Sequence, residues 1–411
     1  MTSEVARVEI TGIAAGGDGV GRTGGMVVFT PRTAIGDLAD VRLARSKRFA
    51  RGRLEGLEIA SPDRVEPSCR HYVADRCGGC QVQHISYDAQ LRAKGVIIGD
   101  ALRRIGHRDV DAVEVEPSDA AWRYRRKLTL HLRRTGSHWI AGLHPHDDPV
   151  AVFDLVECPI TEDRVLAEWS SLRGAFDHLP RERELRVSVR LLAAGAAVVV
   201  EGGGAWPTHQ QFFDAVPSMA ELWWRPERGR MRRLATRALE SESGASFVQI
   251  NARVAARLKT HVVERVRAYA PRRVVDAYAG AGDTALAIAA SGSIVAAIEL
   301  DAEAVARFAG QLRAPSSAIV GKVEDHLARA LPADVVLLNP PRGGVDAAVT
   351  AALQDVRFAP RAIIYVSCDP ATLARDVARM PRYRLASVRA YDMFPQTAHV
   401  ETVCELVPEA A

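Results

Sequence analysis

The sequence predicts a multidomain protein with three parts. These are a small N-terminal antiparallel β-barrel (residues 1–60), a central α+β domain (61–240) and a C-terminal α/β domain with a Rossmann-like, doubly wound sheet (241–411). Three observations predict this arrangement. The chain of 411 residues is too long for one ordinary hydrophobic core. Its first part alternates apolar and polar residues at period two, and its last part alternates apolar strands with helical segments.

The composition is that of a globular protein outside the membrane. Hydrophobic residues make up 48% of the chain and charged residues 25%. No uncharged apolar stretch reaches the ~18 residues of a membrane span. The first residues, MTSEVARVEI, lack the basic-then-apolar layout of a signal peptide. We therefore expect a cytoplasmic protein with no membrane partner.

The N-terminal barrel is predicted from short apolar runs separated by glycine turns. The runs VEITGIA, MVVFTP and DLADVRLARS flank the turn-rich stretch GGDGVGRTGG. Turn residues at this spacing are typical of small antiparallel barrels.

The central region has mixed patterns and a group of cysteines. LRAKGVIIGDALRRIG has a helical pattern, whereas RKLTLHLRR and LRVSVRLL alternate like strands. Cys69, Cys77 and Cys80 lie in CRHYVADRCGGC, and Cys158 in ECPIT is a plausible fourth member. Four thiolates suit either zinc or an iron–sulfur cluster, and their spacing does not separate the two. A redox pair lacks a thioredoxin-like context, and disulfides are disfavoured in a reducing cytoplasm.

The C-terminal region predicts a parallel, doubly wound sheet. The apolar strands RVVDAY, IVAAIEL, DVVLLN and AIIYVS alternate with helical segments. The turn DAYAGAGDT joins the first strand to a helix, and Glu299 ends the next strand, where an acid commonly holds a ribose. The third glycine of a dinucleotide fingerprint is replaced by Ala285. A nucleoside cofactor such as S-adenosylmethionine therefore fits better than NAD, although packing alone can also place glycines in such a turn.

Two further motifs follow strands of this sheet. LLNPPRGG presents Asn339 at a strand's carboxyl end, where open sheets bind ligands, but two prolines also make a stiff loop on their own. YVSCDPATLARD places Cys368 after another strand. From its position alone this thiol could fill the core, bind a metal or act as a nucleophile. Cys404, in the apolar run TVCELV, is most simply a core residue.

Basic residues form two stripes without acids among them. Residues 42–53 carry six, and residues 123–134 carry six more with Trp122 and Tyr124 nearby. Such stripes are the electrostatic footprint expected of a protein that binds a phosphate backbone, or else a solvated basic face.

Several motifs, in order, resemble one family. FVQIN, DAYAGAGD, NPPR, YVSCDPATLARD and DMFPQTAHVET are similar to motifs of the S-adenosylmethionine-dependent RNA (uracil-C5)-methyltransferases, which make 5-methyluridine in ribosomal and transfer RNA. The resemblance covers nearly the whole chain. GDGVGR and KRFARGRL look like the RNA-binding TRAM barrel, an OB-like module. CGGCQVQH, with two further cysteines, is similar to the 4Fe–4S site of the ribosomal RNA branch.

The resemblance implies a mechanism and a set of site residues. Cys368 would be the nucleophile that adds to uracil C6, and Glu401 the base that removes the C5 proton. The residues implied for the cofactor are Gln249, Tyr278, Asp283, Glu299 and Asn339, and those implied for the 4Fe–4S cluster are Cys69, Cys77, Cys80 and Cys158. Phe247 and Gln249 would face the target base. The implied partner is RNA, ribosomal rather than transfer RNA, with the uridine in a single-stranded loop or flipped out, and we expect a monomer.

Three residues depart from the family pattern. Asn339 stands where the family has an acid, Lys322 where an Asp or Asn commonly faces the adenine, and Ala279 where a cysteine is typical. The first two keep open an alternative, a non-catalytic or weakened RNA-binding homologue. Methylation of cytosine C5 or of a base nitrogen is a second alternative, but amino-methylating NPP motifs carry an aromatic where Arg342 stands. A radical enzyme would need a CxxxCxxC spacing that the sequence lacks.

Overall fold

A computed structural model of the chain describes residues 4–192, 194–238 and 249–409. The chain divides into two compact units: residues 1–64, 86–119 and 253–411 form the first, and residues 65–85 and 120–252 form the second. Residues 86–119, which we assigned to the central domain from the sequence, group with the first unit. The three predicted domain ranges stay a prediction.

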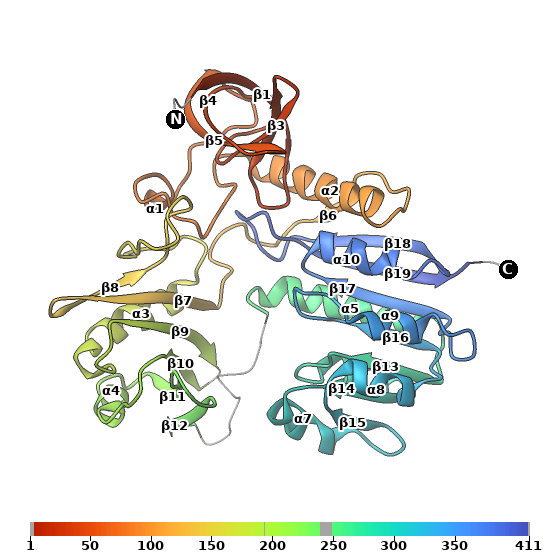
Figure 1. The fold of residues 1–411 in the computed structure, drawn as a ribbon. Helices are drawn as coiled ribbons and strands as arrows, with labels where there is room; N and C mark the ends of the chain where they lie inside the picture. The colour runs from red at the N-terminus through yellow and green to blue at the C-terminus, as the bar shows by residue number, and fades with distance from the viewer. Residues whose placement is uncertain (1–3, 193, 239–248, 410–411) are drawn as a thin grey trace. The chain divides into compact units, whose positions relative to one another are not determined.

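The first unit begins with a closed barrel of five strands (Figure 1). Its strands are β1 (Val5–Ile13), β2 (Gly19–Thr23), β3 (Met26–Thr30), β4 (Leu38–Arg45) and β5 (Phe49–Ile59), and they pair in the order β1-β2-β3-β5-β4. The alternation seen in the sequence buries one face of each strand, with Val8, Val28 and Val41 inside. The predicted barrel is confirmed, except that the β3–β5 pair is parallel.

An eight-stranded sheet forms the remainder of the first unit. Its order is β15 (Ser317–Val320), β14 (Ile294–Glu299), β13 (Arg273–Ala277), β16 (Val335–Leu338), β17 (Ala362–Ser367), β19 (Glu401–Pro408), β18 (Tyr383–Tyr391) and β6 (Val115–Glu116). The strands from β15 to β17 are parallel, as predicted. The sheet continues beyond these strands with a pairing that the sequence did not predict, because β19 runs antiparallel to both β17 and β18. The chain returns from β18 to β19 through a short connection, which needs no crossover helix.

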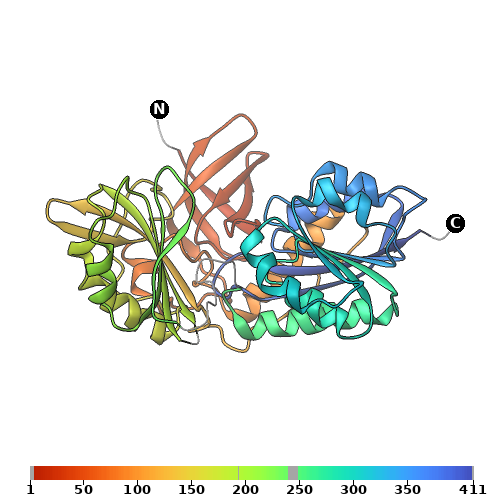
Figure 2. The ribbon, with the colours of Figure 1, turned by 90° about the horizontal axis from the view of Figure 1, so that it is seen from below.

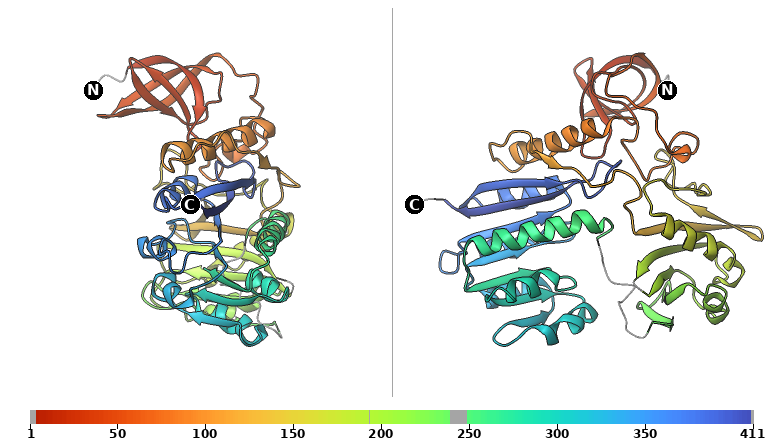
Figure 3. Two further views of the ribbon diagram at one scale, coloured as in Figure 1. Left: turned by 90° about the vertical axis from the view of Figure 1, so that its right-hand side faces the viewer. Right: turned by 180° about the vertical axis from the view of Figure 1, so that it is seen from behind.

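Helices cover both faces of this sheet, as Figures 2 and 3 show. They are α5 (Ala252–Ala268), α6 (Asp283–Ala289), α7 (Ala302–Phe308), α8 (Val323–Ala330), α9 (Ala347–Leu353) and α10 (Pro370–Ala378), with a 3-10 turn at Ala309–Gln311. Successive strand residues belong to different apolar clusters: Val274 packs with α5 and α6, whereas Val275 packs with α8 and α9. This alternation explains why the strands read as continuous apolar runs in the sequence.

Helix α2 (Tyr87–Arg104) belongs to the same unit, although residues 120–252 of the second unit separate it in the chain from every strand of the sheet except β6. Ser86 caps its N-terminus, where its hydroxyl oxygen accepts the amide of Ala89 at 3.4 Å. Ile98 and Leu102 pack in an apolar cluster with Ala374 of α10 and with Val400. The predicted helix is confirmed.

The second unit holds a six-stranded sheet, in agreement with the predicted α+β pattern. The strand order is β12 (Arg232–Thr236), β11 (Met219–Arg225), β10 (Gly195–Glu201), β9 (Glu184–Leu192), β7 (Lys127–Thr135) and β8 (His138–Gly142). The helices are α1 (Arg70–Val73), α3 (Asp163–Arg173) and α4 (His209–Asp214), with a 3-10 turn at Phe176–His178. Trp169 and Phe212 pack on the sheet. No helix in the described ranges is long and apolar enough to cross a membrane.

Candidate active site

The carboxyl ends of the parallel strands gather several predicted site residues at one edge of the sheet. Tyr278 follows β13, Glu299 ends β14, Asn339 follows β16 and Cys368 follows β17. Since β13 pairs with both β14 and β16, the chain order reverses beside β13. Such a switch point is where open α/β sheets bind their ligands.

The turn after β13 has a backbone that requires glycine. Gly280 has a φ of +57° and Gly282 a φ of +81°. Gly282 also caps α6, and a Cβ built on it would lie 2.2 Å from Cγ of Phe308. Tyr278 adopts a φ of +63°, a conformation that costs a non-glycine residue free energy and often occurs in functional sites. Asp283 is the exposed first residue of α6, where the backbone N–H groups have no helical partner.

Glu299 ties the end of β14 to this turn. Its Oε2 atom accepts the amide of Gly280 at 2.8 Å, and its Oε1 atom accepts the amide of Asp301 at 2.8 Å. A carboxylate offers about four acceptor positions, so Glu299 retains capacity for a further partner.

Asp276 lies buried on β13 beneath the same turn, and no hydrogen-bond partner of its Oδ2 atom lies in the described chain. Burial raises the pKa of Asp276 to about 7, an effect opposed by the amide of Ala285 and increased by Glu299. The turn therefore covers a buried polar atom that still lacks a partner.

Asn339 and Lys322 are both exposed at this edge. The backbone amide of Asn339 donates to the carbonyl of Ala277 at 3.3 Å. Lys322 precedes α8, with its ammonium 3.8 Å from Glu324. The NPPRGG turn is tied to α10, because Thr372 Oγ1 donates to the Arg342 carbonyl at 3.0 Å.

Cys368 and Glu401 are brought together by the pairing of β17 with β19. In this antiparallel register Ser367 lies opposite Thr402. Cys368 follows Ser367 in the chain, and Glu401 precedes Thr402. These two residues therefore lie opposite each other at the edge of the sheet. Cys368 is half-buried and Glu401 is 5% exposed.

Burial and one arginine control the charges of this pair. Burial raises the pKa of Glu401 to about 8, and the nearby Arg342 guanidinium opposes the rise. The pKa of Cys368 is also raised, first by burial and then by the charge of Glu401, and Arg342 again opposes the rise. Arg342 is thus an electrostatic neighbour of both groups. We did not assign it a role from the sequence, although the NPPR motif was a signal for it.

The remaining cysteine of this unit behaves differently. Cys404 on β19 is completely buried, and burial raises the pKa of its thiol to about 12. The prediction that Cys404 is a core residue is confirmed.

The four cysteines predicted as ligands lie in the second unit. Cys69, Cys77 and Cys80 are buried, and Cys158 is half-buried. Burial raises the pKa of Cys80, and the charges of the other three thiols add to the rise. Within the described ranges, no group of three or more His, Cys, Asp or Glu side chains has the arrangement of a metal site.

His71 connects the fourth cysteine to the first three. Its Nε2 atom accepts the amides of Val156 at 3.1 Å and Glu157 at 3.4 Å, directly before Cys158. Its Nδ1 atom lies 2.7 Å from Asp75. Because Nε2 accepts, Nδ1 carries the proton and donates it to this carboxylate. His71 thereby fixes the approach of the Cys158 segment.

Two predicted residues cannot be joined to the candidate site. Gln249 lies in the second unit, whereas the other cofactor residues lie in the first. Phe247 lies outside the described residues. The roles of both stay predictions.

The basic stripes are partly paired with acids from elsewhere in the chain. In the barrel, Arg42 and Arg53 contact Glu55, and Arg51 contacts Asp18. In the second stripe, Arg133 contacts Glu184 on the neighbouring strand. Exposed pairs of this kind contribute little stability, so the arginines can exchange these partners for phosphates.

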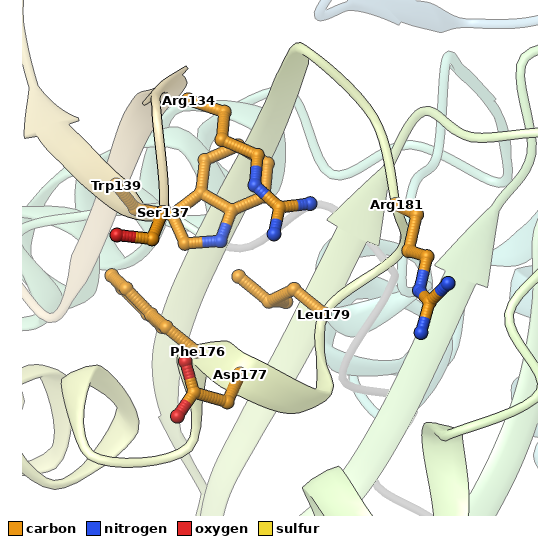
Figure 4. A pocket seen from close by; sticks show the side chains of 7 residues that line it. All are labelled: Arg134, Ser137, Trp139, Phe176, Asp177, Leu179 and Arg181. Atoms are coloured by element: carbon orange, nitrogen blue, oxygen red, sulfur yellow. The ribbon is translucent and has the colours of Figure 1, made fainter.

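A cavity of about 390 Å³ opens in the second unit (Figure 4). Phe176 and Leu179 are buried at its wall, and Arg134 lies over the Trp139 ring with its guanidinium carbon 5.7 Å from the ring centroid. None of the predicted catalytic or cofactor residues lines it.

Comparisons with known proteins agree with this architecture. A sequence model described as TRAM domain matches residues 1–54, which confirms the predicted barrel type, and one described as tRNA (Uracil-5-)-methyltransferase matches residues 323–407. An RNA methyltransferase of Thermosynechococcus vestitus is 32% identical and covers 97% of each chain. An RNA methyltransferase of Synechocystis is also 32% identical, covering 99% of this chain and 96% of that protein. Both relatives are described as uncharacterized.

One solved structure shares the fold over almost the whole length. The tRNA (uracil-54, C5)-methyltransferase of Pyrococcus abyssi, in complex with S-adenosyl-L-homocysteine, superposes with a TM-score of 0.71 and 24% sequence identity. The match covers 98% of this chain and 99% of that chain. A match with a sequence identity of 24% establishes that the two proteins share a fold, and nothing more.

The glycine turn yields a prediction about stability. Gly282→Ala forces a Cβ into the Phe308 ring at a positive φ, so we expect it to lower the free energy of unfolding by about 2–3 kcal/mol. Gly280→Ala is the matched control, because its φ is also positive but no atom lies within 4 Å of the added Cβ, and it should cost about 1 kcal/mol. Urea denaturation measures both. Equal losses would contradict the steric role of Phe308.

Proposed function

Because this chain belongs to the RNA methyltransferase family of these relatives, we propose that it transfers a methyl group from S-adenosylmethionine to C5 of a uridine in RNA. The observation that supports this most strongly is the β17–β19 register, which sets a half-buried thiol beside a buried carboxylate. A methyltransferase acting on a nucleophilic nitrogen needs no such pair. Uracil C5, in contrast, is too weak a nucleophile to take a methyl group unaided.

The turn after β13 and the end of β14 fit a nucleoside cofactor. Glu299 has acceptor capacity left for a ribose, and the start of α6 offers backbone N–H groups. The partnerless Oδ2 atom of Asp276 adds a buried acceptor. Tyr278, Asp283 and Asn339 would complete the contacts, and the cofactor role of Gln249 rests on the family resemblance alone. S-adenosylmethionine supplies an electrophilic methyl group when bound.

Cys368 performs the first step on the uracil. Its thiolate adds to C6, forming a C–S bond, and the electrons of the C5=C6 double bond move so that C5 becomes an enolate carbon. Burial opposes the thiolate, whereas Arg342 favours it. The guanidinium of Arg342 therefore increases the fraction of Cys368 that can react.

Glu401 performs the last step. After methylation C5 carries both a methyl group and a proton, and the carboxylate removes that proton. The electrons of the C5–H bond restore the C5=C6 double bond, the C6–S bond breaks, and the thiolate leaves. A pKa of about 8 suits this role, because the group must both take up and give up a proton near neutrality.

Three features support RNA as the substrate: the barrel, the two basic stripes and the partial burial of the Cys368 thiol. A uridine must leave its stack to reach a half-buried Cys368, so the substrate is a single-stranded loop or a flipped nucleotide. The four cysteines favour ribosomal RNA, on the analogy with that branch of the family. A monomer in the cytoplasm, where thiols stay reduced, completes the proposal.

The four cysteines of the second unit are proposed to hold a 4Fe–4S cluster. The amide of Gly79 donates to Cys77 Sγ at 3.4 Å, the kind of contact that tunes cluster sulfurs. Tyr72, Tyr124 and Ile160 form the apolar surroundings of the thiols.

The exposed Asn339 and Lys322 favour the alternative, a non-catalytic RNA-binding homologue, because both remove negative charge from the cofactor edge. The nearby thiol and carboxylate argue against it, since RNA binding alone needs neither.

The covalent step is tested with 5-fluorouridine. Fluorine at C5 cannot be removed as a proton, so wild-type protein with 5-fluorouridine RNA and S-adenosylmethionine should form a protein–RNA adduct that survives denaturing electrophoresis. Cys368→Ala should form none. Cys404→Ala removes the core thiol of the same unit and should retain the adduct. No adduct with wild-type protein, or an adduct in Cys368→Ala, would overturn the mechanism.

The proton step should depend on pH. Because the carboxylate is the active form of Glu401, the rate at which the adduct with ordinary uridine resolves should rise with pH and level off above about 8. Single-turnover kinetics measure this rate. Glu401→Gln should resolve the adduct about 100- to 10,000-fold more slowly and without that rise. A flat wild-type profile would contradict the assignment.

The cluster has a spectroscopic test. Protein purified without oxygen should be brown and absorb in the blue part of the visible spectrum. Cys80→Ser should lose the colour, whereas Cys368→Ser in the other unit should keep it. A colourless wild-type protein with stoichiometric zinc would show that the cysteines hold zinc instead.

A further inference from the structure

Helix α2 carries a buried lysine that contacts the segment leading into β19. Lys94 is 1% exposed and Asp392 is completely buried, and the Lys94 ammonium lies 2.6 Å from Oδ1 of Asp392. The same ammonium donates to the carbonyl of Phe394 at 3.2 Å. A lysine is rarely buried unless its charge is compensated, so this pair strongly constrains the chain around residue 392.

A second contact lies one helical turn earlier on α2. Gln90 Nε2 donates to Gln396 Oε1 at 2.9 Å. Gln90 Oε1 accepts a hydrogen bond from the backbone amide of Gln396 at 3.0 Å. Gln396 has a φ of +69°, a backbone conformation that residues other than glycine rarely adopt. Gln90 and Lys94 are four residues apart and therefore on one face of the helix. Two anchors on one helix face thus hold one segment.

This segment has no strand or helix of its own. It joins Tyr391, the last residue of β18, to Glu401, the first residue of β19. Asp392, Gln396 and Thr397 are nevertheless buried. Bonds within the segment shape it locally: Thr397 Oγ1 donates to the Phe394 carbonyl at 2.8 Å, and the backbone amide of His399 donates to Thr397 Oγ1 at 3.2 Å. Lys94 and Gln90 add bonds that attach the segment to α2.

The same helix also reaches the nucleophile's side of the site. Ile98 and Leu102 pack with Ala374 of α10, the helix that begins just after Cys368, and with Val400, the residue before Glu401. α2 is therefore packed against the helix that follows Cys368 and against the residue that precedes Glu401.

We propose that Lys94 and Gln90 are positioning residues for the proton-abstraction step, acting through residues 392–400 to set the carboxylate of Glu401 against C5 of the bound uridine. The proposal rests on the function proposed above. Both side chains are buried, so we assign them no contact with the substrate. A displacement of a reacting group by about 1 Å can lower a rate about 100-fold. Loss of the contacts made by Lys94 and Gln90 should therefore slow the proton abstraction that Glu401 performs.

The test follows the adduct with ordinary uridine RNA in the full-length protein. In wild-type protein the adduct is short-lived, because Glu401 resolves it. Lys94→Met keeps the length of the side chain without its charge, and we expect adduct to form at near the wild-type rate but to resolve at least tenfold more slowly, as in Glu401→Gln. Gln90→Leu, which removes two hydrogen bonds and no charge, should slow resolution in the same direction and serves as the test if Lys94→Met does not fold.

Arg265→Met is the matched control. It removes an ion pair between α5 and Glu405, whose Nε–Oε2 distance is 2.8 Å, and so loosens the same strand β19 without touching residues 392–400. At a comparable loss of melting temperature, Arg265→Met should resolve the adduct at the wild-type rate.

Three results decide between the possibilities. Slow resolution in the α2 variants alone supports positioning. If the α2 variants lose adduct formation and adduct resolution to the same extent, Lys94 and Gln90 have a merely structural role and the inference is overturned. The same conclusion follows if Arg265→Met slows resolution as much as the α2 variants do. Failure of wild-type protein to form any adduct with 5-fluorouridine RNA overturns the proposed function itself, and the inference with it.

Discussion

The antiparallel pairing of β17 with β19 is the interaction on which the candidate site depends. It sets Ser367 opposite Thr402, and thereby brings a thiol and a carboxylate from distant parts of the chain to one edge of the sheet. Strand registers cannot shift gradually: a slip of one residue would turn every side chain of β19 to the other face. The apolar clusters on both sheet faces oppose such a slip, because Cys404 and Leu406 pack on one of them and Val403 on the other.

Local patterns predicted the barrel, the parallel strands and the strand ends at which several candidate residues lie. The alternating VEITGIA and the apolar AIIYVS became β1 and β17, and Cys368 and Glu299 lie at strand ends as their positions in the sequence suggested. The place of β19 between β17 and β18 was not predictable in this way, because it depends on pairing between distant segments. The effect of Arg342 on Glu401 was missed for the same reason: two strands and a turn must assemble before they become neighbours.

Charge was the least reliable guide. A basic run in the sequence does not reveal its partners, and Glu4, Asp18 and Glu184 reach three of these arginines from elsewhere in the chain. Interleaved aromatics can mislead in a similar way, since Tyr124 is buried among the cysteines and so is not free to stack on a base. The spacing of Cys69, Cys77 and Cys80 was informative, but the link that His71 makes to the Cys158 segment required the structure.

The contact between Lys94 and Asp392 spans 298 positions of the chain, and residues 120–252 of the second unit lie between them in the sequence. Contacts of such high sequence separation form late, because a long loop must close before they contribute any free energy. The acid–base member of the pair would then be set only in the last stage of folding. Under the proposed mechanism, a chain with Cys368 in place but Glu401 not yet set could form the RNA adduct and could not resolve it.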